Sequence, residues 1–475
     1  MPSPNDSQAS QPHWLLPVVV SLPLALQTLD TTIMGPALPA MAASLRVQPL
    51  QLNLAVTAYL ISLAIFLPAS GWLSDRFGAR RMFCFAIALF SVSSGLCALA
   101  NSLEMLVACR VLQGMGGSIM IPVGRIILLR SVSPAAMVGA MVWFTMVPAV
   151  ARLVGPLISG LAVTWLSWRW IFLGNLPFGL VAIALALWLI KPSPMTRPAT
   201  RFDVRGFLLL AFALVSLLAA VEGATSRVID GRIALALMAA GTAAAVIYVY
   251  SSRRALHPII DLGVLRYRTY FASVVGGIPL RLAIGAVPFM LPLLFQLSFG
   301  MSPIQSGLLT VSSAIGSFTT RVTITQALRH VGFRTLMMTA TVCCSLAYFG
   351  YSQFRASTPH LAIACALVMG GLAMSMAIVS LQTLAFSEIP DPLIGNATVL
   401  ATMVQQLTIS FGVMAAAELL QLAAHLRGGS AAQLQASDFQ VAFVCIGVIV
   451  PLSCLFLLRL PRDTGSAMRN SKGGL

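Results

Sequence analysis

Long apolar runs recur from one end of the chain to the other, and short polar stretches separate them. Several runs exceed the roughly 18 apolar residues that mark a membrane-spanning helix. Their recurrence is typical of a polytopic helical bundle rather than of a single anchored domain. With charges, Pro and Gly taken as boundaries, the pattern predicts about 14 spans. They lie near residues 14–42, 50–73, 82–101, 104–129, 135–165, 171–190, 206–224, 232–251, 270–298, 303–328, 335–354, 361–385, 397–422 and 438–459.

The connections between the predicted spans are short. The longest polar ones cover residues 191–205, 251–269, 387–396 and 427–438, and none is long enough for a soluble catalytic domain. We therefore expect the protein to act within the bilayer. An even number of spans also places both termini on the same side of the membrane.

Composition and charge support this class. Of the 475 residues, 58% are hydrophobic and only 9% are charged, whereas roughly 25% charged residues are usual in soluble domains. An ordinary soluble enzyme is therefore excluded. The net charge of +16 could suggest a nucleic-acid partner, but the apolar fraction leaves no solvated basic face. The basic residues favour the connections on the side of the termini by about three to one, which predicts that both termini are cytoplasmic.

Several kinds of site are missing from the sequence. The first eleven residues contain no Lys or Arg, so they lack the basic region of a signal peptide, and we expect the first span to be retained. All eight cysteines lie in apolar runs without a CxxC pair, and the five histidines lie in loops or at helix ends. We expect no disulfide, metal site or cofactor. The only lysines, Lys191 and Lys472, do not follow Gly as a P-loop requires, so we expect no ATP hydrolysis and no enzyme activity, and an ion gradient remains as the energy source.

An internal repeat divides the chain. Residues 75–80 (DRFGAR) follow the second span, and residues 329–334 (RHVGFR) follow the tenth, with Gly and Arg in register. This placement predicts a duplicated six-helix unit with two extra helices between the copies. The expected divisions are a cytoplasmic tail at 1–13, an N-terminal six-helix bundle at 14–190, a linker with two extra transmembrane helices at 191–269, a C-terminal six-helix bundle at 270–460 and a cytoplasmic tail at 461–475.

Five segments carry a resemblance to a known family. They are residues 29–33 (LDTTI) with 37–39 (ALP), residues 71–81 (GWLSDRFGARR), residues 110–114 (RVLQG), residues 155–160 (GPLISG) and residues 168–172 (WRWIF) with Asn175 and Pro177. With these motifs the chain resembles the major facilitator superfamily, in its branch of 14-helix drug:proton antiporters of the EmrB/QacA type, and within that branch the MdtD-like subgroup. The chain departs from the usual motifs at Gly35, where the family has Asn, and at Ala151, where it has Gly.

The resemblance implies an all-α fold of two six-helix bundles plus two central helices. It implies a conformational latch in the cytoplasmic loop, formed by Gly71, Asp75, Arg76, Gly78 and Arg80. We expect Asp75 to pair with Arg80 or to face the start of a helix from the other half near Asn396. The other reading of these residues is positive-inside topology plus a turn. The resemblance also implies a helix-packing motif at Gly155, Pro156 and Gly160.

Asp30 is the clearest candidate for a functional residue. It is the only acidic residue well inside the first predicted span, and a carboxylate in a low dielectric can become a proton carrier. Arg110 lies about 9 Å from the outer start of the fourth span, at a depth where it could meet Asp30. We assign proton coupling to Asp30 and Arg110. A permanently closed pair would instead make Asp30 structural, so coupling requires the pair to open.

Arginines outnumber acids inside the predicted spans. Arg125 and Arg321 lie towards the cytoplasmic ends, where we expect them to snorkel. Arg152 and Arg281 lie deeper, and either bind an anionic substrate or pair with backbone carbonyls. We include both, together with Gln27 and Gln296, among the candidate substrate-binding residues. Such glutamines either line a hydrated cavity or form hydrogen bonds between helices.

The leading hypothesis is a proton-coupled secondary transporter of the bacterial inner membrane that exports small amphipathic molecules by alternating access. Its expected partners are membrane lipid, protons and a small-molecule substrate, without nucleic acid, and we expect a monomer. One alternative is a carrier of organic anions or anionic metal chelates, because of the buried arginines. Another is an intramembrane enzyme or a membrane sensor that does not transport.

Overall fold

The computed structural model describes residues 15–132, 137–190, 192, 202–226, 230–255, 258–331, 333–390, 393–429 and 433–458, and none of these residues forms a strand. The N-terminal half contains α1 (Leu15–Leu45), η1 (Pro49–Leu52), α2 (Asn53–Phe66), α3 (Ala69–Phe77), α4 (Ala79–Ala98), α5 (Leu103–Ser131), α6 (Met137–Trp165), α7 (Arg169–Leu173) and α8 (Asn175–Leu189). The central pair is α9 (Val204–Ser226) and α10 (Gly231–Ser252). The C-terminal half contains η3 (Leu262–Arg266), α11 (Arg268–Val274), α12 (Ile278–Leu293), η4 (Leu294–Ser298), α13 (Pro303–Val331), α14 (Phe333–Ser352), α15 (His360–Ala385), α16 (Ile394–Leu426), α17 (Ala436–Ile449) and α18 (Leu452–Leu457).

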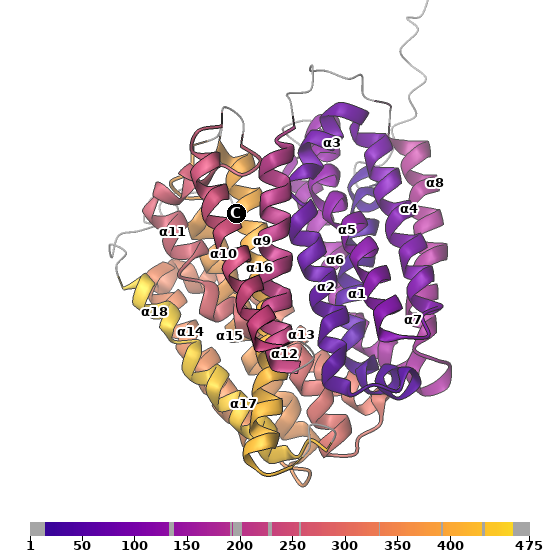
Figure 1. Ribbon diagram of the computed structural model, residues 1–475, viewed down its shortest axis with the longest axis vertical. Helices are drawn as coiled ribbons and strands as arrows, with labels where there is room; N and C mark the ends of the chain where they lie inside the picture. The colour runs from indigo at the N-terminus through magenta and orange to yellow at the C-terminus, as the bar shows by residue number, and fades with distance from the viewer. Residues whose placement is uncertain are drawn as a thin grey trace, which may run out of the picture.

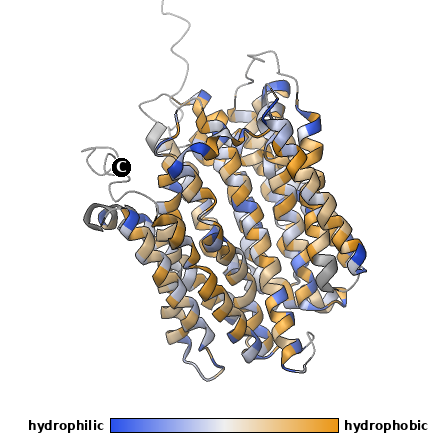
Figure 2. Ribbon diagram, turned by 60° about the vertical axis from the view of Figure 1, so that its left-hand side comes forward, coloured by the Kyte–Doolittle hydropathy of each residue, from blue (hydrophilic) through white to orange (hydrophobic). Residues whose placement is uncertain are grey.

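The two halves stand side by side as helical bundles (Figure 1), with α9 and α10 forming a hairpin between them along the chain. The hairpin contacts the N-terminal half where Phe207 of α9 lies 5.5 Å from Phe66 of α2, ring centre to ring centre. Apolar residues dominate the long helices in Figure 2, as a bilayer requires. We call the end of the bundle where α1 begins the inner end, predicted to face the cytoplasm, and the opposite end the outer end.

The prediction of an all-α polytopic bundle is confirmed. Twelve described helices are long and apolar enough to cross a membrane. The predicted spans at 303–328 and 335–354 correspond to α13 and α14, which have 29 and 20 residues but do not belong to those twelve. The total of 14 therefore stays a prediction. In α13 the apolar signal is weak because Ser, Thr and Arg321 interrupt it, and this helix packs between α6 and α15 inside the bundle.

Besides the predicted span at 171–190, which Gly174 divides into α7 and α8, three predicted spans are interrupted rather than continuous. Pro68 separates α2 from α3, and Pro451 separates α17 from α18. Proline lacks the N–H that would continue the helical hydrogen bonds. The third break lies between α11 and α12, where Gly276 and Gly277 occur. At the turn between α3 and α4, Gly78 has a φ of 88°, which only glycine adopts without strain.

The halves touch each other near the outer end. A β-carbon built on Gly160 of α6 would lie 2.8 Å from the Pro303 carbonyl oxygen at the start of α13. One built on Gly35 of α1 would lie 2.9 Å from the carbonyl oxygen of Pro288 in α12. An asparagine at position 35, as in related motifs, would not fit this arrangement. The departure of Gly35 from the family pattern therefore has a packing reason.

Within the C-terminal half, two glycines let α12 and α16 cross closely. Side chains added at Gly285 and Gly412 would meet the backbone carbonyls of Ile409 and Leu282 on the opposite helix. We expect Gly285→Ala to lower the unfolding midpoint in detergent, at a cost of about 1–3 kcal/mol, because the backbones must move apart. Gly350→Ala, where the added carbon meets nothing within 4 Å, is the matched control. Equal midpoints for the two variants would contradict this account of the crossing.

An ion pair closes the outer loop between α16 and α17. Arg427 donates from Nε to Asp438 Oδ1 at 2.9 Å and from Nη2 to Oδ2 at 3.0 Å. The hydrogen bonds to this carboxylate raise the pKa of Arg427. Asp438 also accepts from the backbone N–H of Gln435 at 2.8 Å, so the pair holds the start of α17.

Candidate polar centre in the N-terminal half

Asp30 and Arg110 meet inside the N-terminal bundle, as their predicted depths suggested. Arg110 Nη1 of α5 lies 2.5 Å from Asp30 Oδ2 of α1. The side chains are 1% and 0% exposed. Neither is exposed to bulk solvent in this state, so each depends on the other for its charge to be tolerated.

Gln113 completes this cluster, although it was not among the predicted site residues. Its Nε2 donates to Asp30 Oδ1 at 2.9 Å, and its Oε1 accepts from Arg110 Nη1 at 2.7 Å. Gln113 is fully buried. It follows Arg110 by three residues, so both lie on one face of α5, and this spacing within the 110–114 motif was the signal that could have found it.

Aromatic rings and a backbone carbonyl enclose the Arg110 guanidinium. Its Cζ lies 4.4 Å from the ring centre of Tyr59 in α2 and 5.8 Å from that of Phe172 in α7. Its Nε donates to the carbonyl of Ala55 at 3.4 Å. Stacking on the ring faces adds cation–π stabilisation to the ion pair. Arg110 is therefore held in place independently of Asp30.

This arrangement has a chemical consequence for the carboxylate. With Asp30 ionised, Arg110 and Gln113 occupy both of its oxygens. If Asp30 took up a proton, the attraction to Arg110 would disappear, while Gln113, Ala55 and the Tyr59 ring would still hold the guanidinium. The contacts that hold the Arg110 guanidinium therefore do not all depend on the charge of Asp30.

Gln27 lies beside this cluster. It is located one turn from Asp30 on α1, on the inner side, and is 5% exposed. Its amide lies next to Gly117 of α5, and its Oε1 has no hydrogen-bond partner among the described residues. Gln27 therefore adjoins the polar centre rather than a wide cavity.

Arg281 lies at the break between α11 and α12. It is 2% exposed, and its Nη1 donates to the carbonyls of Ser273 and Val274 at 2.9 and 3.0 Å. These two carbonyls lie at the end of α11, where the break deprives them of helical partners. A substrate contact by Arg281 stays a prediction, and in this structure the side chain binds backbone carbonyls instead.

Gln296 joins the two halves near the outer end. Its Nε2 in η4 donates to the carbonyl of Pro36 in α1 at 2.9 Å. A carbonyl oxygen has two lone pairs, so that of Pro36 can accept this bond as well as one within α1. Of the two uses expected for such glutamines, the hydrogen bond between helices is the one seen for Gln296.

Arg152 has the opposite environment to Arg281. On α6, Arg152 shares a face with Gly155, Pro156 and Ser159, and this face meets α1 and α13. Yet its side chain is exposed and has no hydrogen bond or ion pair among the described residues. Arg152 therefore faces the space between the halves on the inner side of their contact.

Arg321 of α13 approaches Arg152 from the other half. Its Nη2 donates to the carbonyl of Thr145 in α6 at 3.2 Å. The expectation that Arg321 snorkels to the inner surface stays a prediction, and in this structure its side chain reaches across to α6. The charges of Arg321 and Arg152 repel each other. Two exposed cations from different halves thus share one region.

The packing motif of α6 lies where expected, between helices. A side chain on Gly155 would meet Thr32 of α1, and Ser159 donates to the carbonyl of Ile33 at 2.6 Å. On the other side, a β-carbon on Gly307 of α13 would lie 2.5 Å from the Pro156 carbonyl oxygen. The motif therefore lets α6 pack closely against α1 of its own half and α13 of the other half.

The residues of the expected latch lie at the inner end around α3. Asp75 pairs with Arg130 at the end of α5, with 3.3 Å between Nη2 and Oδ1, and both side chains are about half exposed. Arg80 donates to the Leu187 carbonyl of α8. Asp75 therefore has neither of its expected partners, and all of these contacts stay within the N-terminal half. Among the described residues Arg76 forms no ion pair, and a β-carbon added at Gly71 would meet nothing within 4 Å.

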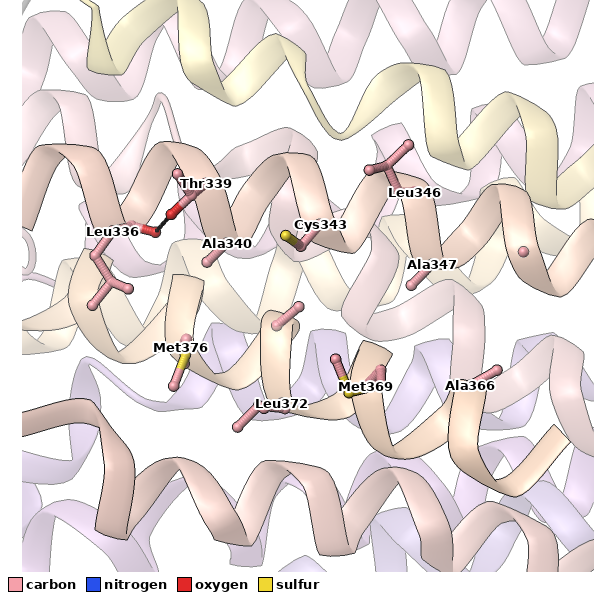
Figure 3. A pocket seen from close by; sticks show the side chains of 12 residues that line it. Leu336, Thr339, Ala340, Cys343, Leu346, Ala347, Ala366, Met369, Leu372 and Met376 are labelled. Carbon is pink, nitrogen blue, oxygen red and sulfur yellow. Dashed lines mark hydrogen bonds between the residues drawn. The ribbon is translucent and has the colours of Figure 1, made fainter. Parts of the chain in front are cut away.

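An apolar groove of about 420 Å³ runs between α14 and α15 in the C-terminal half (Figure 3). Met369, Met376, Cys343 and Leu346 are among its lining residues, and no charged side chain lines it. Its lining contains no carboxylate and no imidazole, the groups that most often exchange protons near neutral pH. Among the described residues, no three His, Cys, Asp or Glu side chains gather as metal ligands would.

Comparisons with known proteins extend this picture to the whole chain. Residues 21–413 match the family described as Major Facilitator Superfamily. A protein of Salmonella paratyphi A that is named for multidrug resistance, MdtD, is 33% identical over 450 residues, which is 95% of each chain.

Two solved structures have the same fold. An auto-inhibited peptide transporter of the POT family superposes with a TM-score of 0.70 at 15% identity, covering 97% of this chain and 99% of the other. A D-xylose-proton symporter gives a TM-score of 0.68 at 17% identity, covering 95% and 98%.

Proposed function

Because the chain belongs to the major facilitator superfamily, a family of transporters, we propose that it is a proton-coupled secondary transporter that exports small amphipathic molecules. The observation that carries the proposal is the buried cluster of Asp30, Arg110 and Gln113. A sealed carboxylate with a separately held counter-charge is suited to taking up and releasing one proton per cycle. We further propose a monomer in a bacterial inner membrane, with both termini cytoplasmic and no enzymatic step.

The proposed cycle couples protonation of Asp30 to the arrangement of the halves. In this structure the halves meet at the outer end, through Gly160 and Pro303 and through Gly35 and Pro288. Thr31 lies one turn inward of Gly35 on the same face of α1, and its side chain is exposed. The state is therefore closed outside and more open inside. An ionised, paired Asp30 suits a stage after a proton has left to the cytoplasm.

The pair of Asp75 and Arg130 supports a latch that is released in this state. Both residues are exposed and belong to the N-terminal half, so this pair does not join the inner ends of the two halves. In the opposite state, we propose that Asp75 leaves Arg130 and faces a helix end of the C-terminal half. Gly78 would keep the turn in the shape that presents Asp75.

Purified protein in liposomes tests the proposed function. The vesicles would enclose a pH-sensitive dye, and ethidium would be added as a cationic amphipathic probe and carboxyfluorescein as an anionic one. We expect proton movement that depends on at least one probe and that substrate-free controls lack. A protein that moves no protons with any member of a broader drug panel, and yet binds one of them, would favour the sensor over the transporter.

A second candidate function, transport of organic anions, is favoured by Arg152 and Arg321. Both are exposed, both lie on the facing sides of α6 and α13, and they repel each other when no anion lies between them. A carboxylate or phosphate group would neutralise this region and could accept hydrogen bonds from both guanidinium groups.

We expect Arg152→Gln to weaken transport of carboxyfluorescein about tenfold, as loss of one charge-assisted hydrogen bond predicts. Transport of ethidium should stay unchanged or improve, because a repelling charge has gone. Arg232→Gln, an exposed arginine at the start of α10, is the control for the charge change alone. An equal loss for both probes would remove the reason for the anion alternative.

A further inference from the structure

Two buried polar groups next to the ion pair are incompletely satisfied. The hydroxyl of Tyr59 interacts with the side chain of Gln27, but Oε1 of Gln27 makes no hydrogen bond among the described residues, although Tyr59 is fully buried and Gln27 is 5% exposed. A buried polar atom without a partner is costly, by about 1–3 kcal/mol, and such atoms commonly hold ordered water. These atoms therefore mark a place where water molecules would be stabilised.

The two groups converge on a glycine. A β-carbon built on Gly117 of α5 would lie 3.3 Å from the Tyr59 hydroxyl and 3.4 Å from Gln27 Nε2. Because glycine has no side chain, both polar groups can approach the backbone of α5 closely at this level. Arg110, Gln113 and Gly117 follow one another at helical spacing on one face of α5, so these polar groups adjoin the ion pair.

The same groups also lie between the ion pair and the space separating the halves. Asp30 is fully buried, but its neighbour Thr31 is exposed, and Gln27 lies one turn from Thr31 on the same side of α1. Tyr59 spans both levels, because its ring covers Arg110 at 4.4 Å and its hydroxyl reaches Gly117. A proton that leaves Asp30 towards the inner end has these polar groups beside its path.

We propose that Gln27, Tyr59 and the bare backbone at Gly117 form a water-binding site that relays protons between Asp30 and the space between the halves. During release, the O–H bond of protonated Asp30 breaks and its proton passes to the bound water. That water gives one of its protons to water in the inner space, and the carboxylate is left paired with Arg110. The inference rests on the proposed role of Asp30 and assigns Gln27 and Tyr59 as positioning residues that hold the water.

Infrared spectroscopy after a pH jump tests the relay without a transport substrate. The probe is the proton itself, and the readout is the rate at which the carbonyl band of protonated Asp30 disappears in the full-length protein in liposomes. The band is identified by its loss in Asp30→Asn. We expect Tyr59→Phe and Gly117→Ala each to slow the change at least about tenfold while leaving its final amplitude intact.

Two features of these variants distinguish effects on proton transfer from effects on folding. Tyr59→Phe keeps the ring over Arg110 and removes only a hydroxyl whose contact is with the Gln27 side chain, so its unfolding midpoint should change little. Gly124→Ala is the matched control for Gly117→Ala, because it adds a carbon to the same helix but meets only apolar atoms, the nearest being Val20 Cγ1 at 3.1 Å. It should exchange protons at the wild-type rate.

The outcomes separate the relay from the proposed function. If the Asp30 band changes at the wild-type rate in both Tyr59→Phe and Gly117→Ala, the relay is wrong and the role of Asp30 stands. The relay is also wrong if Gly124→Ala slows the band as much as Gly117→Ala does. If no band in the wild-type protein is missing from Asp30→Asn at any pH, Asp30 takes up no proton and both proposals fail.

Discussion

Asp30→Asn should abolish proton-driven transport, with a loss of roughly 100-fold or more in the initial rate. Asparagine keeps the shape of the side chain and can still accept from Arg110 or Gln113, but it cannot take up and release a proton. Substrate exchange across the membrane without a proton gradient should survive, because that half-reaction requires no proton on Asp30. Proton flux and substrate exchange measured on the same liposomes check this split.

A control is needed because the variant leaves Arg110 buried without a counter-charge. The double change Asp30→Asn with Arg110→Gln removes both charges and preserves hydrogen bonding between the two helices. We expect this protein to fold as well as the wild type and still to lack proton-driven transport. Full gradient-driven pumping by either variant would remove Asp30 from the mechanism.

The second large effect is on stability. Arg110→Met should destabilise the protein by about 3–5 kcal/mol, because a carboxylate that is 0% exposed loses the one ion-pair partner it has among the described residues. Gln113 alone cannot compensate, since it supplies one neutral hydrogen bond. Denaturant or thermal unfolding in detergent, followed by helical circular dichroism, measures the loss.

The partner variant separates the charge from the packing. Arg110→Met combined with Asp30→Leu replaces the pair with apolar side chains, and we expect it to recover stability to within about 1–2 kcal/mol of the wild type. A single Arg110→Met protein as stable as the wild type would mean that Asp30 is already neutral in the folded state. The proposal that the cluster alternates between an ionised and a protonated Asp30 would then be wrong about the ionised state.

The sequence predicted the ion pair from few signals. Asp30 stands out because acids are rare in membrane spans, and Arg110 stands out for the same reason at a comparable depth. Once the order of the helices is assumed, depth limits which of these groups can meet. The contact between them is confirmed, at 2.5 Å, while their role in coupling stays a proposal.

Rotation about the helix axis was harder to predict than depth. Arg152 and Arg281 appeared equivalent as deep arginines, yet the first is exposed between the halves and the second binds carbonyls at a helix break. Arg321 appeared to be a snorkelling residue, and in this structure its side chain reaches Thr145 of the other half. In helices that are apolar on nearly every side, the pattern of polar residues does not show which face meets a partner helix.

By itself, the sequence determined the class of fold, the position of most spans within a few residues and the membership in a transporter family. It could do so because bilayer thickness and backbone hydrogen bonding in lipid act on each segment separately. Only the tertiary structure decided that Gln113 completes the ion pair, that Tyr59 and Gln27 converge on Gly117, and that Asp75 pairs with Arg130. These contacts depend on the distances between helices. Close packing at glycines such as Gly155 and Gly285 sets those distances, and no single segment encodes them.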